Sequence, residues 1–320
     1  MKKTIALIQV LLLTFLLFTA CGTSTAESTP PAVTESQTGS SSNAASTANP
    51  SQSNTSSSFD SSKSIIVVSR EDGSGTRGAF IELFEIQKKN DAGENVDHTT
   101  DEATITNSTS VMMTTVSTND YAIGYISLGS LNDTVKALAI DSADATVANI
   151  IAGSYKISRP FNIAVKEDIN DLAKDFIDFI LSKDGQEVIS GGGYIAVSEN
   201  AAFNGTKPSG KIVVAGSSSV TPIMEKLKEA YLSINPNAEI EIQQSDSSTG
   251  MTAAIDGICD IGMASRELKD SEKDAGLVDT RIAIDGIAVI VNNNNPLSGV
   301  SKDTIMEIFT GEIEKWSDVA

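Results

Sequence analysis

The sequence predicts an α/β fold with two domains. One pattern occurs three times, at 65–86, 212–231 and 240–255. In each segment a short apolar run is followed by a loop rich in glycine and hydroxyl residues, and then by apolar residues at helical spacing. Residues 65–320 are numerous enough for two domains of ordinary size. We therefore expect helices that begin directly where buried strands end.

The N-terminus is typical of an export signal. Lys2 and Lys3 precede an apolar run, 5–18, that is too short to span a bilayer comfortably, and Thr19-Ala20-Cys21 follows. This is the pattern of a bacterial lipoprotein signal at 1–21, with Cys21 as the lipid-modified residue, although Phe18 stands where leucine is usual. The alternative is an ordinary cleaved signal with an incidental cysteine.

Residues 22–64 are almost entirely serine, threonine, alanine, asparagine, glutamine, proline and glycine. Such a composition cannot offset the entropy of ordering, so we expect a disordered tether. With a lipid anchor at Cys21, the folded part would be held at the extracytoplasmic face of the cell membrane. Cys259 is the only other cysteine, so it is expected to be a small buried hydrophobe without a disulfide partner.

The chain is strongly acidic, with 23 Lys and Arg against 42 Asp and Glu and a formal net charge of −19. This charge argues against nucleic acid as a partner and against binding to anionic membrane surfaces. Any anion that binds must therefore be held by local dipoles and by one or two arginines.

The loop at 69–77 predicts an anion site, and phosphate in particular. Gly73 and Gly75 let the backbone approach a ligand, and Ser74 and Thr76 add hydroxyl donors. The first turn of the following helix presents unpaired N–H groups at the positive end of the helix dipole. Arg70 offers a planar fork of donors to an oxyanion. The helix itself is expected to carry the apolar residues Phe80, Leu83, Phe84 and Ile86.

Two further loops have the same character. The loop at 216–222 ends with Pro222, which suits a first helical position, and the loop at 243–250 again enters a helix. Three hydroxyl-rich helix N-termini in one chain are expected to converge on one ligand. The apolar faces of the two later helices comprise Ile223, Leu227, Ala230 and Tyr231, and Met251, Ala254 and Ile255.

Six segments together resemble the phosphate-binding lipoproteins that feed phosphate ABC importers, and the resemblance spans about 65–320. The segments are 67–78, 122–125, 215–220, 260–268, 284–291, and 308–311 with Trp316. The resemblance implies a two-domain, hinged fold of the type II periplasmic-binding-protein kind, with the anion in the interdomain cleft. It implies an extracytoplasmic receptor, without enzymatic activity or cofactor, that delivers inorganic phosphate to the membrane permease subunits of an ABC importer.

The order of the segments departs from the family. Its second half, about 65–198, precedes its first half, about 211–320, and the polar connector 199–210 joins them. This order predicts a circular permutation, which succeeds where natural termini lie close; the alternative is a truncated tandem pair. The family's two domain crossings then fall near 158–161 and 291–292.

The resulting domains are a split one, 65–158 plus 291–320, and a continuous one, 159–290. Two helical stretches fit this plan through their apolar faces. These faces comprise Leu172, Phe176, Phe179 and Ile180, and Ile305, Ile308 and Phe309.

The resemblance also implies a set of phosphate contacts. They are Arg70, Ser74, Gly75 and Thr76 from the split domain, and Ser218, Ser219 and Ser247 from the continuous one. Ser265 and Arg266 are added as an anion-contacting pair. They stand where many members have an aspartate that accepts a proton from hydrogen phosphate and so rejects sulfate. Asp285 is a candidate acceptor instead, or an ion-pair partner of Arg266.

Other residues are expected to be structural. Arg77 should form an ion pair, His98 should be a solvated loop residue, and Trp316 should pack near the crossover. An enzyme, such as a serine-based phosphoester hydrolase, is disfavoured because the only histidine lies in a polar loop and no metal-ligand cluster appears. The remaining alternative is a surface adhesion or sensory lipoprotein that retains the fold without transport.

Overall fold

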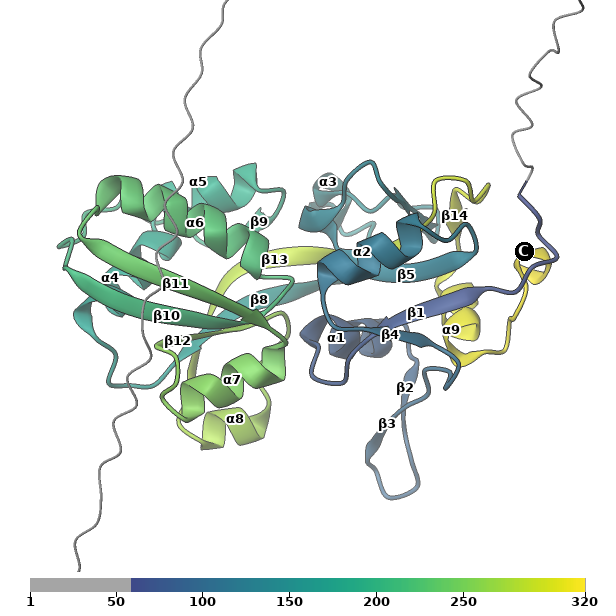
Figure 1. Cartoon of the computed structure of the whole chain (residues 1–320), viewed down its shortest axis with the longest axis horizontal. Helices are drawn as coiled ribbons and strands as arrows, with labels where there is room; N and C mark the ends of the chain where they lie inside the picture. Colours follow the sequence, from purple (N-terminus) through teal and green to yellow (C-terminus); the bar gives the residue numbers. More distant parts are fainter. Residues whose placement is uncertain (1–58, 320) are drawn as a thin grey trace, which may run out of the picture. The chain divides into compact units, whose positions relative to one another are not determined.

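A computed structural model describes residues 59–319 as two lobes connected by two long antiparallel strands (Figure 1). The predicted signal at 1–21, Cys21 and the tether up to residue 58 lie outside the described residues. Within 59–319, none of the helices combines the length and the apolarity that crossing a membrane requires.

The first lobe contains residues from both ends of the described chain. Its elements are β1 (Ile66–Arg70), α1 (Gly75–Leu83), β2 (Gln87–Lys89), β3 (Asn95–Asp97), β4 (Thr104–Thr106), α2 (Thr109–Ser117), β5 (Ala122–Ser127), the short 3-10 helix η1 (Leu128–Ser130), β6 (Lys136–Ala137), β7 (Ala139–Ile140), α3 (Val147–Ile151), β14 (Gly299–Val300), α9 (Lys302–Thr310) and the 3-10 helix η2 (Trp316–Asp318).

The second lobe is built from the middle of the chain. Its elements are β8 (Ser158–Val165), α4 (Asp171–Leu181), α5 (Lys183–Gly191), β9 (Ile195–Ala196), β10 (Gly210–Ser217), α6 (Thr221–Ile234), β11 (Ala238–Ser245), α7 (Ser247–Ile255), β12 (Ile261–Ala264), α8 (Asp270–Asp274) and β13 (Val278–Val291), whose last residues continue into the first lobe.

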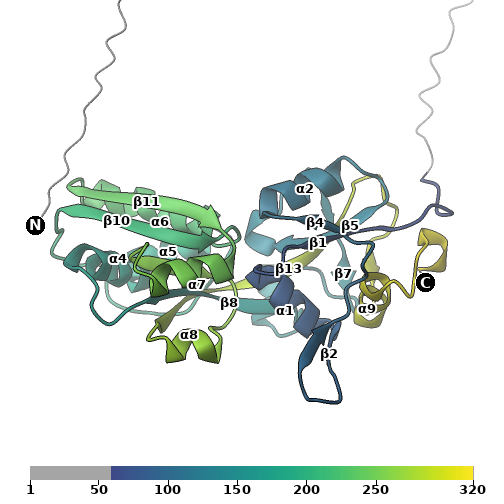
Figure 2. The same ribbon diagram turned by 60° about the horizontal axis from the view of Figure 1, so that its bottom comes forward.

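One mixed sheet runs through both lobes in the order β11-β10-β12-β8-β13-β5-β1-β4. In the first lobe, β1 is parallel to β5 and to β4. Helices α1 and α9 cover one face. There the Phe80 ring stacks on the Tyr125 ring with centroids 3.9 Å apart, and its centroid lies 4.7 Å from that of Phe309. Helix α2 covers the other face, as Figures 1 and 2 both show.

In the second lobe, β10 is parallel to β11 and β12, and β8 is antiparallel to β12 and β13. Helices α4, α5 and α6 pack on one face of this part of the sheet and α7 and α8 on the other, so the lobe has a core on each face. The predicted apolar faces of α4 and α9 are buried, and Pro222 lies in the first turn of α6.

The two lobes are connected through β8 and β13. Strand β8 begins at Ser158, where Ile157 still packs in the core of the first lobe and Phe161 already packs in that of the second. Strand β13 pairs with β8 up to Gly286 and with β5 from Ile287 onward. Residues 287–290 therefore pack in the first core, whereas the sequence placed them in the continuous domain, because one unbroken strand passes through both lobes.

Two local expectations were wrong. Helix α1 ends at Leu83, and Glu85 adopts a positive φ of 58°, so Ile86 enters the first core from the following loop. Residues 59–64 were assigned to the tether, yet they lie on the first lobe, because Phe59 packs against Tyr121 and Trp316 with ring centroids 5.1 Å and 5.9 Å apart.

Trp316 does not pack at the crossing. The chain after α9 doubles back along the start of β1, where Ser64 pairs with Lys315 and Ile65 donates to the Glu314 carbonyl. Trp316 is buried there and donates its indole N–H to the Tyr121 carbonyl at 3.1 Å. Tyr121 precedes the first residue of β5, whereas the crossing lies at the last one, Ser127, which pairs with Ile287.

Candidate anion-binding site

The structure brings the three hydroxyl-rich loops together between the lobes. Thr76 Oγ1 and Ser219 Oγ lie 2.7 Å apart, and Arg70 donates from Nη2 to Ser218 Oγ at 3.1 Å. The third loop meets the first through its backbone, since the N–H of Ser248 donates to the Gly73 carbonyl at 3.2 Å. Residues about 145 positions apart in the chain thus share one cluster. The three loops converge, as their common hydroxyl-rich character predicted.

Glycine is required at position 75 because the two lobes approach most closely there. A Cβ built on Gly75 would lie 2.5 Å from Ser247 Oγ and 2.8 Å from Ser265 Oγ, closer than real Cβ contacts. The backbone at the start of α1 can therefore meet the hydroxyl groups of the second lobe only without a side chain.

The Arg70 guanidinium is held in place by its own neighbour. Its Nε and Nη2 each donate to the Glu71 carboxylate at 2.7 Å, and the Arg70 side chain is 3% exposed. This fork-on-fork geometry fixes the guanidinium, and Nη2 also donates to Ser218 Oγ of the cluster. Ser74 caps α1, because its Oγ accepts from the Arg77 N–H at 3.3 Å.

On the second lobe, three serines form a continuous chain of hydrogen bonds. Ser217 donates from Oγ to Ser265 Oγ at 3.0 Å, and the Ser265 N–H donates to Ser247 Oγ at 3.1 Å. All three are buried, so their hydroxyl groups are fixed by one another and by the backbone.

Four helix N-termini surround this cluster, one more than the sequence predicted. Helices α1, α2, α6 and α7 all begin beside the contacting hydroxyls, and none has an acidic residue in its first turn. The positive ends of the four dipoles favour an anion at this point. Asp246, the cap of α7, is the one carboxylate in a cap position among them.

The expected partners of Arg266 and Asp285 need correction. Arg266 donates to both carboxylate oxygens of Glu272, at 2.8 Å and 2.7 Å, and to Ser248 Oγ at 3.2 Å. Asp285 pairs with Arg159 at 3.0 Å rather than with Arg266, because β13 places it directly opposite Arg159 on β8. Burial raises the pKa of the Asp285 carboxyl, and the Arg159 guanidinium opposes that rise.

Two residues of the cluster were missed by the sequence analysis. Thr109 Oγ1 lies 3.3 Å from Ser219 Oγ, at the start of α2, and Arg159 donates to Thr76 Oγ1 at 2.7 Å. The signal for Thr109 was the hydroxyl run at 108–110 after the threonine-rich segment 104–106. The signal for Arg159 was a single charge inside an otherwise apolar strand at the predicted crossing.

Arg77, His98 and Cys259 have the structural roles that the sequence predicted. Arg77 forms ion pairs with Asp72 at 2.7 Å and Asp97 at 2.9 Å. His98 is exposed, and Cys259 is buried without a disulfide. Among residues 59–319 there is no group of His, Cys, Asp and Glu that fits a metal ion. The cluster between the lobes offers N–H and hydroxyl donors, which suit an oxyanion.

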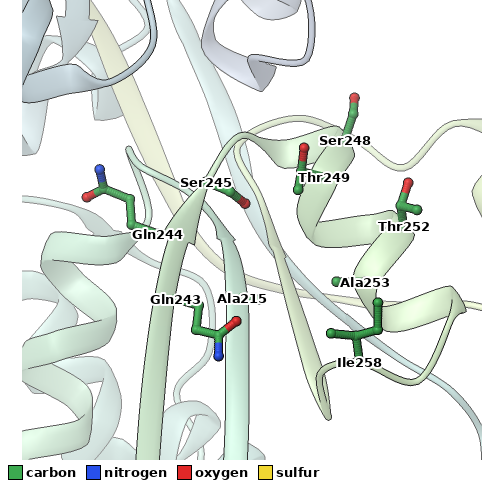
Figure 3. Close-up of a pocket in the computed structure, with 9 residues that line it drawn as sticks. All are labelled: Ala215, Gln243, Gln244, Ser245, Ser248, Thr249, Thr252, Ala253 and Ile258. Carbon is green, nitrogen blue, oxygen red and sulfur yellow. The ribbon is translucent and has the colours of Figure 1, made fainter.

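A separate hollow of about 480 Å³ lies on the second lobe between β11 and α7 (Figure 3). Hydroxyl and amide groups line it, among them Gln243, Ser245 and Thr252, with Ile258 at its edge. None of the nine predicted anion contacts lines this hollow, which adjoins the cluster between the lobes at Ser248.

The chain is similar in sequence to known proteins. A family profile described as "PBP superfamily domain" matches residues 51–184 and 201–320. The chain is 60% identical over 265 residues to "Phosphate-binding protein PstS 2" of Streptococcus agalactiae serotype V, covering 82% of this chain and 90% of the relative. It is 45% identical over 259 residues to the protein of that name in Streptococcus pneumoniae serotype 4, covering 81% and 88%.

A solved structure is also similar. The crystal structure of a phosphate ABC transporter phosphate-binding protein from Streptococcus pneumoniae aligns with a TM-score of 0.64 and 44% sequence identity, covering 80% of this chain and 100% of that one. The profile match, the sequence identity and the shared fold agree with one another. The chain belongs to the PBP superfamily and, within it, to the family of PstS phosphate-binding proteins.

Proposed function

We propose that this protein binds inorganic phosphate between its two lobes and delivers it to the permease subunits of an ABC importer. The observation that carries the proposal is the hydrogen-bonded contact of Thr76 with Ser219 and of Arg70 with Ser218 across the lobes. A tetrahedral oxyanion needs hydrogen-bond donors on several sides. These four side chains offer donors from both lobes, and a hinge between the lobes can change their separation. The names of the Streptococcus relatives support phosphate as the anion.

The proposed contacts to phosphate are Arg70, Ser74, Gly75, Thr76, Ser218, Ser219, Ser247 and Ser265. Their burial and mutual hydrogen bonds support the set. Arg266 stays in the proposal as a flanking cation, because its guanidinium is already bound to Glu272 and reaches the cluster through Ser248. Thr109 joins the set because it touches Ser219.

The polypeptide is proposed to act from a lipid anchor at Cys21, outside the cytoplasmic membrane, with the segment from residue 22 to about residue 58 as the tether. The sequence pattern at 1–21 supports this, and the family of extracytoplasmic receptors is consistent with it. Metabolic labelling with a fatty acid tests the anchor, since Cys21→Ala should abolish incorporation. Labelling that persists in Cys21→Ala would contradict it.

The circular permutation is proposed for this branch of the family. A single alignment spans 82% of this chain and 90% of the S. agalactiae relative, so that protein has its segments in the same order. The isolated bridge between Ser64 and Lys315 supports the idea that the two chain segments that the permutation separates lie close together. A variant that starts at Gly210, joins residue 320 to Phe59 so that residues 59–64 are kept, and ends at Glu199 should fold and bind phosphate. An unfolded product would count against the permutation.

The first experiment is calorimetric titration of a soluble chain starting at Gly22, with phosphate and then with sulfate, while its mass in solution is measured. Tight binding of phosphate by a folded monomer is expected. A folded protein that binds no phosphate would favour the alternative, an adhesion or sensory lipoprotein that has kept the fold. Equal affinity for sulfate would show an anion receptor without phosphate selectivity.

A further inference from the structure

Behind the hydroxyl cluster lies a buried cation that contacts both lobes. Arg159 is the second residue of β8, and its side chain is 2% exposed. Its Nη1 donates to Thr76 Oγ1 of the first lobe at 2.7 Å and to the Ser265 carbonyl of the second lobe at 3.1 Å. Its guanidinium thus holds one proposed ligand residue from each lobe at the strand where the chain passes between them.

The charge of Arg159 is balanced by a carboxylate with no exposed surface. Asp285 lies opposite Arg159 in the β8–β13 ladder and accepts from its Nη2 at 3.0 Å. Ser127 donates to the other Asp285 oxygen at 2.9 Å, so the carboxylate itself is fixed. Because the pair is neutral as a whole, Arg159 adds little net attraction for an anion, and its effect must come from geometry.

That geometry fixes the direction of the Thr76 hydroxyl. A guanidinium has only donors, so Thr76 Oγ1 must accept from Arg159. Ser219 Oγ is the other hydrogen-bond partner of Thr76 Oγ1 among residues 59–319. Both hydroxyls are about 99% buried, and a proton pointing elsewhere would be left unpaired. The Thr76 proton is therefore directed into the cluster, and polarisation by the cation makes it a stronger donor.

We propose that Arg159 is a positioning residue for anion binding, which orients the Thr76 hydroxyl so that it donates to an oxygen of the bound anion. The proposal rests on the phosphate-binding function proposed above. It adds a requirement on the ligand. The anion oxygen next to Thr76 must accept a hydrogen bond, so an unprotonated oxygen is preferred there over a protonated one, which is the weaker acceptor. Asp285 holds the Arg159 guanidinium in this position through its hydrogen bond to Nη2.

A double-mutant cycle on phosphate affinity tests this proposal. Full-length mature protein is titrated calorimetrically as wild type, Arg159→Met, Thr76→Val and the double variant. Each single substitution is expected to weaken binding by about tenfold or more, the cost of one hydrogen bond to a charged group. The double variant is expected to be no weaker than the weaker single variant, since Arg159 then has no hydroxyl to orient. Losses that multiply would overturn the proposal.

Thr76→Ser supplies the matched control, because it keeps the hydroxyl. Arg159→Met should weaken phosphate binding as much in the Thr76→Ser background as in the wild type, whereas a purely structural role would give the same loss in the Thr76→Val background as well. Arg159→Met leaves Asp285 unpaired and could therefore fail to fold. In that case the pair of substitutions Arg159→Met and Asp285→Leu, which removes both charges, takes the place of Arg159→Met in the cycle.

The outcomes separate the two proposals. A wild type that binds no phosphate would overturn the proposed function and this inference with it. A wild type that binds phosphate, together with independent effects of the two substitutions, would overturn only the role of Arg159.

Discussion

Thr76 Oγ1 and Ser219 Oγ lie 2.7 Å apart although 143 residues separate them in the chain and each belongs to a different lobe. Each residue lies beside the N-terminus of a helix, α1 and α6 respectively. The contact therefore brings two positive helix ends together, an arrangement that is unfavourable unless negative charge lies between or beside them. Substitutions at this contact between the lobes should therefore weaken the binding of phosphate.

The Ser219 hydroxyl is expected to contribute directly to phosphate affinity. Ser219→Ala removes the group that meets both Thr76 and Thr109, and binding should weaken by about tenfold, or about 1.4 kcal/mol. Calorimetric titration with phosphate measures the loss. The matched control is Ser233→Ala on the exposed side of α6, whose hydroxyl bonds only its own helix at the Glu229 carbonyl. Equal affinity of both variants would contradict the assigned site.

Closure of the lobes is expected to depend on Gly75. Gly75→Ala places a methyl group within 2.5 Å of Ser247 Oγ, so the lobes should no longer meet and phosphate affinity should fall by at least tenfold. Gly78→Ala is the control within the same helix, because nothing lies within 4 Å of its Cβ. That variant should bind normally and gain about 0.5–1 kcal/mol of stability. Small-angle scattering with phosphate should show compaction of the control only.

The Arg266–Glu272 pair is expected to make stability depend on pH in the acidic range. Burial alone would raise the pKa of Glu272, but hydrogen bonds from Arg266 and the Lys269 N–H outweigh it, and the pKa lies below its ordinary value of 4.5. A carboxyl with a lowered pKa in the folded state stabilises the fold above its unfolded pKa, and this contribution is lost as the pH falls through the folded pKa.

Glu272→Gln should therefore lower the free energy of unfolding by about 1–3 kcal/mol near neutral pH and should flatten its decrease below about pH 4.5. Urea unfolding as a function of pH measures both effects. Glu229→Gln, at an exposed position on α6, is the control and should follow the wild-type curve. An unchanged pH dependence in Glu272→Gln would contradict the role of this pair.

Phe59 is expected to belong to the folded domain. Phe59→Ala removes its packing on Tyr121 and Trp316 and should cost about 1–2 kcal/mol of stability. Trp316 is the only tryptophan, so its fluorescence should shift toward that of an exposed indole. Ser61→Ala at an exposed neighbouring position should leave both stability and fluorescence unchanged. No difference between the two variants would return residues 59–64 to the tether.

Much of the site could be predicted from local sequence. Ser74 and Thr76 stand at a helix start after a buried strand, and short-range rules about glycine, hydroxyl groups and helix ends identify such positions. Arg159 could not be assigned in this way. Its contacts with Thr76, Ser265 and Asp285 span 83 to 126 positions of the chain, and no local pattern encodes which buried carboxylate balances a given guanidinium.

By itself, the sequence determined the strand–loop–helix units, the hydroxyl-rich helix starts at their loops and most of the helix faces that are buried, because each depends on residues within a few positions of one another. Only the tertiary structure decided that Asp285 pairs with Arg159 and Arg266 with Glu272, and that β13 changes partner at Gly286. These choices depend on strand register and on which charges burial brings together. The energy of a buried ion pair is set by distance and desolvation, and neither is a property of a segment alone.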